Sequence, residues 1–177
     1  MNKYGPKEIL LGTIKTCLLL IVLEIFTTAF LPAMGIINFR PEFNVLIVLF
    51  LAFKLETPVL AWLIMIVQYV HSLFSIEGWA IGAFTGVLVS MSVRYLKDML
   101  DFSTAISTII VVQIFQVAWF VATSFLLSLK LGDFGNFFHL FWQDIPESLA
   151  LSILSPFFFF VLDRVWRVKS KAVGVAI

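Results

Sequence analysis

The chain alternates between long apolar runs and short polar connections. The apolar runs cover residues 9–31, 43–53, 59–76, 79–93, 105–129 and 149–162. A helix that crosses a bilayer needs about 20 predominantly apolar residues. The pattern therefore predicts an all-α protein, a polytopic integral membrane bundle of about six transmembrane helices.

The second run is too short to cross a membrane by itself. Its 11 residues rise about 16 Å, whereas the hydrocarbon core is about 30 Å thick. This segment must be extended by its flanks, be re-entrant, or pair as a half-helix with its neighbour. Pro58 is expected to break the chain before the third run, because proline disfavours helical geometry in the preceding residue. Only Glu77 and Gly78 separate the third and fourth runs, which predicts a tight helical hairpin.

Composition supports the membrane interpretation and limits the possible functions. Of the 177 residues, 61% are hydrophobic and 13% charged, whereas soluble domains carry about 25% charged residues. We therefore expect a single transmembrane domain over residues 1–177, with no room for a separate catalytic domain. The net charge of +1 and the dispersed basic residues argue against nucleic-acid binding. Cys17 is the single cysteine, so the chain has no internal disulfide.

The basic residues predict the orientation of the helices. Lysine and arginine favour the cytoplasmic connections of membrane proteins. With six spans, ten of the twelve basic residues fall on one face, and only Arg40 and Lys130 on the other. We therefore expect both termini to be cytoplasmic. The ten are Lys3, Lys7, Lys15, Lys54, Arg94, Lys97, Arg164, Arg167, Lys169 and Lys171.

A long outer loop is expected between the fifth and sixth spans, over residues 130–147. Its aromatic residues recur at helical spacing, with polar residues among them. This pattern predicts an interfacial helix in the outer headgroup zone, where aromatic rings anchor. The alternative is a docking surface for a periplasmic or membrane partner. The aromatic residues are Phe134, Phe137, Phe138, Phe141 and Trp142.

Small residues recur at intervals of four along the fourth span. Gly78, Gly82, Gly86 and Ser90 are expected to form one stripe of that helix. Such a stripe allows another backbone to approach closely, which drives helix association in lipid. Its partner is either another helix of the same bundle or a different protein chain, a second copy included.

Five polar side chains inside the predicted spans are candidates for an intramembrane group. Glu24 is the only acidic residue well inside a span, and an intramembrane carboxylate is by default a functional hypothesis. At 1.5 Å per residue, Glu24 and His71 lie about 22 and 20 Å from the inner ends of their helices, so they could meet. Gln113 and Gln116 share a face of the fifth span and could join them, and Gln68 shares a face with His71. The group either fixes the helix register, contacts another membrane protein, or lines a ligand cavity.

Enzyme signatures are missing from the sequence. It contains no HExxH, GxSxG or GxxxxGK[ST] motif, and the two histidines, His71 and His139, have no metal ligands at suitable spacing. We therefore expect no catalytic residues, no metal site and no cofactor.

Several motifs, in order, resemble those of the MreD family, the small polytopic subunit of the bacterial rod-shape complex. Glu24, Thr27 and Thr28 end the first span, and Arg40-Pro41-Glu42-Phe43 opens the second. A glycine hairpin follows at residues 75–80. The last span contains Ile145-Pro146-Glu147, Ser155-Pro156 with four phenylalanines, and Leu162-Asp163-Arg164 before a basic tail. One departure is that residues 61–74 contain neither the glycines nor the aspartate usual in the family, so that Gln68 and His71 take the polar place.

The resemblance implies a non-enzymatic scaffold in the bacterial inner membrane. Such a scaffold binds MreC and links MreB filaments to the RodA-type glycosyltransferase and its penicillin-binding transpeptidase. Pro41, Glu42, Pro156 and the aromatic residues of 130–147 then become candidate docking residues. The family is also similar in fold to the S-components of ECF vitamin transporters, so the alternative is a substrate-binding subunit for a small solute.

Overall fold

The computed structural model describes residues 5–36, 39–55, 59–75, 78–96, 104–132, 134–135 and 137–166, without the side chains of 139–141, 143 and 144. All regular structure in these ranges is helical, which confirms the predicted all-α fold. The helices are α1 (Pro6–Ile25), which continues through a π-helical turn (Phe26–Phe30) into α2 (Leu31–Ala33), then α3 (Phe43–Lys54), α4 (Leu60–Ser72), α5 (Trp79–Leu96), α6 (Ala105–Leu131) and α7 (Phe137–Trp166).

Four helical segments are long and apolar enough to cross a membrane. They are Pro6–Ala33, Trp79–Leu96, Ala105–Leu131 and Ile145–Trp166. α3 and α4 are shorter, with 12 and 13 residues. α4 therefore covers less than the apolar run from 59 to 76 that predicted it. Pro58, which was expected to break the chain before α4, and Glu77, which was expected to join α4 to α5 with Gly78, lie outside the described residues.

α3 forms the centre of the bundle. Every residue from Asn44 to Ala52 is buried, and none of the apolar side chains among them is more than 5% exposed. α1, α4, α5, α6 and α7 all pack against α3. A helix that is apolar on all sides is stable only when it is surrounded. The short second run is therefore a central helix enclosed by the others.

The outside of the bundle is apolar. Large side chains on five helices are between 58% and 71% exposed. A soluble protein rarely exposes apolar side chains over so much of its surface, so this surface matches the one that lipid would cover. Examples are Leu18, Trp62, Phe84, Met91, Ile106 and Phe157.

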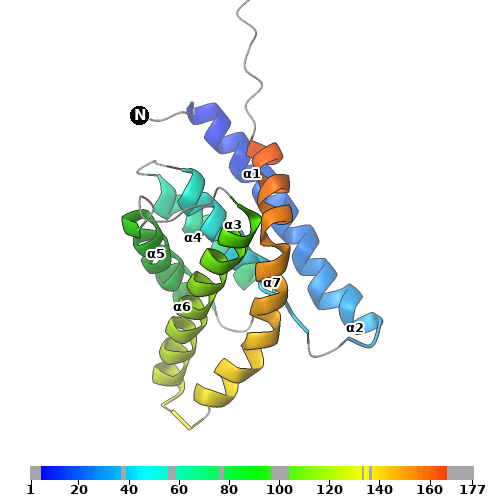
Figure 1. Cartoon of the computed structure of the whole chain (residues 1–177), viewed down its shortest axis with the longest axis vertical. Helices are drawn as coiled ribbons and strands as arrows, with labels where there is room; N and C mark the ends of the chain where they lie inside the picture. The colour runs from blue at the N-terminus through cyan, green and yellow to red at the C-terminus, as the bar shows by residue number, and fades with distance from the viewer. Residues whose placement is uncertain are drawn as a thin grey trace, which may run out of the picture.

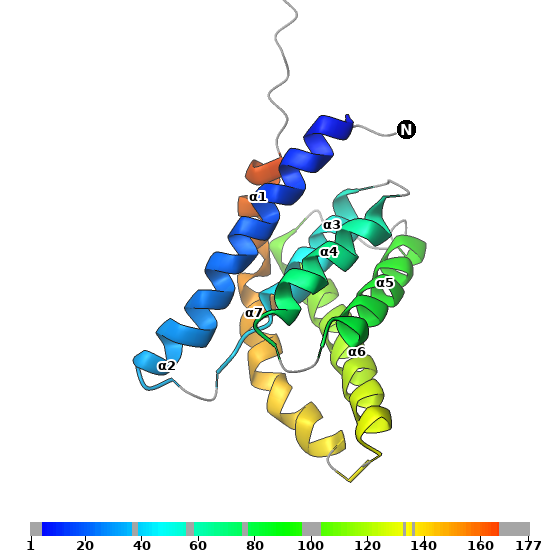
Figure 2. The same cartoon turned by 180° about the vertical axis from the view of Figure 1, so that it is seen from behind.

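The beginning of α1 and the end of α7 lie at the same end of the bundle (Figures 1 and 2). We call this end the basic end, because Lys54, Arg94 and Arg164 lie in the last turns of α3, α5 and α7, which also end there. Lys54 pairs with Asp163 across two of these turns. The shared end agrees with an even number of passes through the bundle.

The expected long loop over residues 130–147 is wrong. α6 continues to Leu131, where Gly132 ends it with a left-handed backbone (φ 69°). α7 begins at Phe137 and runs through Pro146, so the predicted helix over the aromatic residues is present but is continuous with the last span. An internal proline removes one backbone hydrogen bond and bends a helix, and Figure 1 shows α7 bent between its yellow and orange parts.

Candidate functional site

Glu24 and His71 lie together in the interior, as their depths along the two helices predicted. Oε1 of Glu24 is 2.6 Å from Nδ1 of His71. Glu24 is 6% exposed and His71 9%. The pair joins the last turn of α1 to the last turn of α4.

The backbone around Glu24 widens directly after the pair. The π-helical turn begins at Phe26, and the hydroxyls of Thr27 and Thr28 both donate to the carbonyl of Glu24, at 3.0 and 2.6 Å. A π-turn interrupts the regular i to i−4 ladder, and such turns are frequent at functional sites. The two threonine hydroxyls therefore supply donors to the Glu24 backbone carbonyl, next to the turn that interrupts the regular helix.

The short distance between Glu24 and His71 is that of a charge-assisted hydrogen bond. In an apolar interior, each member of such a pair depends on the other, because an unpaired buried polar group keeps its full desolvation cost. The pair therefore fixes the position of α1 against α4.

Gln68 lies one turn before His71 on α4, but its partner is Asn44 of α3. Asn44 Nδ2 donates to Gln68 Oε1 at 3.3 Å, and both residues are 1% exposed. Three polar atoms of this region have no hydrogen-bond partner among the described residues: Asn44 Oδ1, Gln68 Nε2 and His71 Nε2. Asn44 was not among the predicted residues, although an asparagine in an otherwise apolar run is a visible signal.

Gln113 and Gln116 do not join Glu24, so that part of the prediction is wrong. They bind serines of α7 instead. Gln113 Nε2 donates to Ser148 Oγ at 3.0 Å, and Ser152 Oγ lies 2.7 Å from Gln113 Oε1 and 3.0 Å from Gln116 Oε1. The rotation of α6 turns its glutamines toward α7. The expected group of five is therefore two groups, one between α1, α3 and α4 and one between α6 and α7.

The small residues of α5 pack inside the bundle. A Cβ at Gly82 would lie 2.6 Å from Gln68 Oε1, and one at Gly86 would lie 2.8 Å from Ile64 Cγ2 and 3.2 Å from the Trp119 ring. Ser90 is 3% exposed and continues this face. These positions allow α4 and α6 to approach α5 closely.

Gly78 is not part of this stripe, contrary to the prediction. It precedes α5 and has a left-handed backbone (φ 84°), and among the described residues no other part of the chain lies within 4 Å of an added Cβ. Its role is the turn before α5, where a positive φ favours glycine.

Two motifs that are far apart in the sequence meet at the end of the bundle opposite the basic end. The backbone N–H of Arg40 donates to Glu147 Oε1 at 2.9 Å, and the Arg40 guanidinium donates to the carbonyl of Phe74 at 3.4 Å. Pro41 is buried and Glu42 is half-buried. Of the expected docking residues, Pro41 is therefore part of the core.

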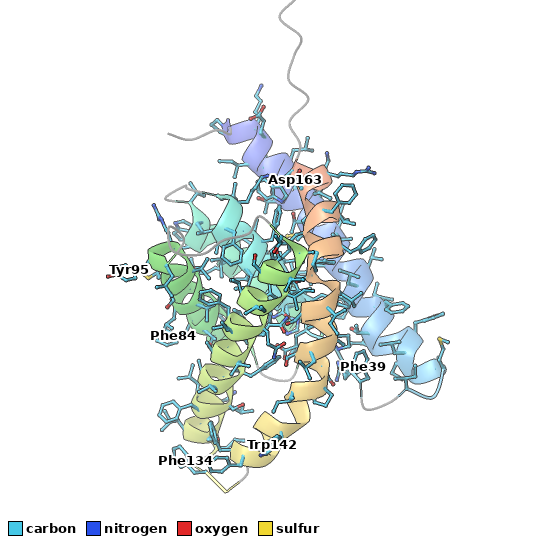
Figure 3. All side chains as sticks on the ribbon, in the orientation of Figure 1. Phe39, Phe84, Tyr95, Phe134, Trp142 and Asp163 are labelled. Atoms are coloured by element: carbon cyan, nitrogen blue, oxygen red, sulfur yellow. The ribbon has the colours of Figure 1, made fainter. Side chains whose placement is uncertain are left out.

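The aromatic residues at the start of α7 lie at the tip of the α6–α7 hairpin. Phe134, Phe138 and Trp142 are 52%, 69% and 67% exposed, and Phe137 stacks edge-on against Phe138. Figure 3 shows Phe134 and Trp142 at this tip, with Asp163 at the opposite end. The side chain of Phe141 lies outside the described residues. Pro156 is far from this tip and lines a cavity near the basic end.

No cluster of three or more metal-ligating side chains occurs in the described ranges. Where the described polar side chains of the interior form hydrogen bonds, they bond either to one another, as in the two groups above, or to backbone carbonyls of their own helices. No family model, curated protein or solved structure matches this chain, so its function has to be inferred from its own residues.

Proposed function

We propose that the protein is a non-enzymatic scaffold subunit of the bacterial cell-wall elongation complex in the inner membrane. It crosses the membrane with six helices, two of them short, and keeps both termini in the cytoplasm. It binds an MreC-type periplasmic protein and links the MreB filament to the RodA-type glycosyltransferase and its transpeptidase.

The hydrogen bond between Arg40 and Glu147 is the main support for this proposal. These two residues belong to two of the motifs on which the family resemblance rests, Arg40-Pro41-Glu42-Phe43 and Ile145-Pro146-Glu147. Their hydrogen bond joins the segment before α3 to α7 at the residue that follows Pro146. The bond supports a structural role for both motifs, because it fixes the direction in which the α6–α7 hairpin projects.

The projecting tip is the surface that we assign to the periplasmic partner. It extends beyond α4 and α5 (Figures 1 and 2) and exposes Phe138 and Trp142. Exposed aromatic side chains on a fixed support are the usual hot spots of protein interfaces. A membrane protein without catalytic motifs is expected to act by binding a partner.

The proposal is tested by depletion and by partner recovery in a rod-shaped bacterium. Depletion should turn the cells round, and Trp142→Ala with Phe138→Ala should lower recovery of the MreC-type partner at least fivefold, as loss of aromatic hot spots of about 1 kcal/mol or more would. Trp79→Ala with Phe84→Ala is the matched control, because these side chains are 52% and 60% exposed on α5. Rod-shaped cells with normal wall synthesis after depletion would refute the scaffold proposal.

A substrate-binding subunit of a small-solute transporter is the second candidate. The unpartnered buried atoms of Asn44, Gln68 and His71 support it, because polar groups of this kind orient a ligand. The division of the five polar residues into two groups argues against one cavity lined by all of them. Thermal-shift screening against vitamins and nucleobases discriminates the two candidates. A ligand-induced stabilisation that is lost in Glu24→Gln would favour transport.

A further inference from the structure

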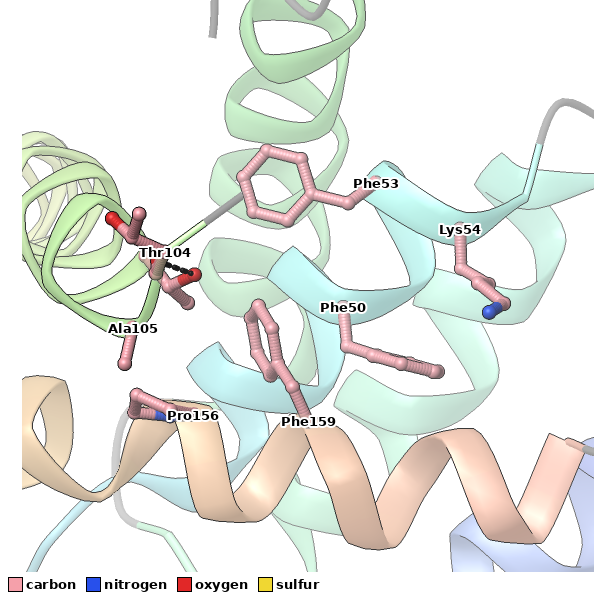
Figure 4. Close-up of a pocket in the computed structure, with 8 residues that line it drawn as sticks. Phe50, Phe53, Lys54, Thr104, Ala105, Pro156 and Phe159 are labelled. Atoms are coloured by element: carbon pink, nitrogen blue, oxygen red, sulfur yellow. Dashed lines mark hydrogen bonds between the residues drawn. The ribbon is translucent and has the colours of Figure 1, made fainter. Parts of the chain in front are cut away.

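A cavity of about 460 Å³ opens near the basic end, away from both polar groups. It lies between the end of α3, the start of α6 and the middle of α7 (Figure 4). Its volume is in the range of small-molecule sites, about 300 to 1,000 Å³. The lining residues are Phe50, Phe53, Lys54, Thr104, Ala105, Thr108, Pro156 and Phe159.

One wall of the cavity is aromatic and fixed. The ring centroids of Phe53 and Phe159 are 6.2 Å apart, and those of Phe50 and Phe159 are 5.6 Å apart. Pro156 leaves the carbonyl of Ser152 without its helical donor, and Ser155 Oγ supplies one at 2.7 Å. The Ser152 carbonyl on the proline side of the cavity therefore keeps a hydrogen-bond donor.

Polar groups lie at both sides of the aromatic wall. In Figure 4, Thr104 at the start of α6 lies on one side of Phe53 and Phe159, and Lys54 lies on the other side. Thr104 caps α6 by accepting from the N–H of Ser107 at 3.1 Å. The first N–H groups of a helix have no intrahelical acceptor and carry partial positive charge. The α6 side of the cavity therefore carries only partial positive charge, and Lys54 supplies the full positive charge on the other side of the wall.

Lys54 already pairs with Asp163, but this pair is accessible. The side chains are 41% and 31% exposed, and exposed ion pairs contribute little to stability. The predicted six-span topology also puts ten basic residues at this end and only five acidic ones, which are Glu8, Glu56, Asp98, Asp101 and Asp163. An anionic group at the cavity mouth can therefore compete for the ammonium group.

We propose that this cavity binds an anionic phospholipid of the inner leaflet. One acyl chain lies against Phe53 and Phe159, and the phosphate lies at the mouth beside Lys54. The charge of the basic end selects a negative headgroup, and the phenylalanines provide the apolar surface for the chain. This proposal rests on the proposed orientation, with both termini in the cytoplasm, and does not depend on the scaffold role.

Native mass spectrometry of the full chain in detergent tests the site, by titration with phosphatidylglycerol and with phosphatidylcholine of the same acyl chains. Lys54→Gln should weaken phosphatidylglycerol binding about fivefold, the value of one lysine near a membrane surface. Lys15→Gln is the matched control, because Lys15 is an exposed lysine of α1 and does not line the cavity. Ala105→Leu should weaken binding of both lipids, because it fills the cavity.

Asp163→Asn separates lipid binding from a merely structural role of the ion pair. Like Lys54→Gln it breaks the pair, but it leaves Lys54 free for the phosphate. It should therefore strengthen phosphatidylglycerol binding, about two- to fivefold. Three results would each overturn the proposal: equal affinity for the two lipids, equal losses in Lys15→Gln and Lys54→Gln, or a dimer that Ala105→Leu removes, which would make a second copy the occupant.

Discussion

Replacing Glu24 and His71 by apolar residues measures how much their buried pair contributes to the free energy of unfolding. Breaking a buried pair from one side leaves the other group unpaired, which costs about 3 to 5 kcal/mol in soluble proteins. Hydrogen bonds in membrane proteins have averaged only about 0.6 kcal/mol, with a maximum near 1.7, because the unfolded state in the membrane also finds partners. The 2.6 Å distance and the exposed fractions of 6% and 9% place this pair toward the upper end of the membrane values.

We therefore expect Glu24→Leu or His71→Leu alone to lower the free energy of unfolding by about 1 to 3 kcal/mol. The double variant should lose less than the sum, with a coupling energy of about 1 to 2 kcal/mol. Glu24→Gln should keep the wild-type stability or exceed it, because the amide oxygen can still accept from His71 while a buried carboxylate is removed.

The assay is reversible unfolding in mixed dodecylmaltoside and SDS micelles, followed by tryptophan fluorescence. Gln113→Leu, in the second polar group, is the control, because its effect should add to that of Glu24→Leu without coupling. A coupling energy below about 0.3 kcal/mol between Glu24 and His71, within the error of additivity, would refute the reasoning that the pair fixes α1 against α4.

Two further predictions concern the packing of α5 and α7. Gly86→Leu should destabilise the protein by more than about 2 kcal/mol, because even a Cβ at this position meets Ile64 and Trp119; Ala80→Leu, on the exposed face of α5, should change stability by less than about 0.5 kcal/mol. Equal melting temperatures for the two variants would contradict the inward orientation of the stripe. Ser152→Ala should lower the free energy of unfolding by about 0.5 to 1.5 kcal/mol, since two glutamine oxygens lose a shared donor. Ser92→Ala is the control, because among the described residues Ser92 bonds only to its own helix; an equal loss of stability in both variants would show that the bonds between α6 and α7 contribute nothing of their own.

The sequence by itself determined the helices and the axial positions of their residues. Apolar runs of sufficient length have to become helices in a membrane, because every backbone group must be satisfied within the segment. The fixed rise per residue then gives the depth of each side chain. For this reason Glu24 and His71 could be predicted at matching depths, and the structure places them in contact.

Only the tertiary structure decided how each helix is rotated and which helix it faces. Depth alone could not separate the partners of Gln113 from those of Glu24, because both residues lie near the middle of the bundle. The rotation of α6 against α7 separates them, and Ser148 and Ser152 complete the second group.

The central position of α3 and the continuity of α7 were also decided by packing. A short apolar run is compatible with several placements, and only the five surrounding helices select a buried one. By itself Pro146 is compatible with either a helix end or a bend. The contacts of α7 with α6 keep the chain helical on both sides of the proline. Local patterns fix position along an axis, whereas rotation and neighbours follow from the packing of all the helices together.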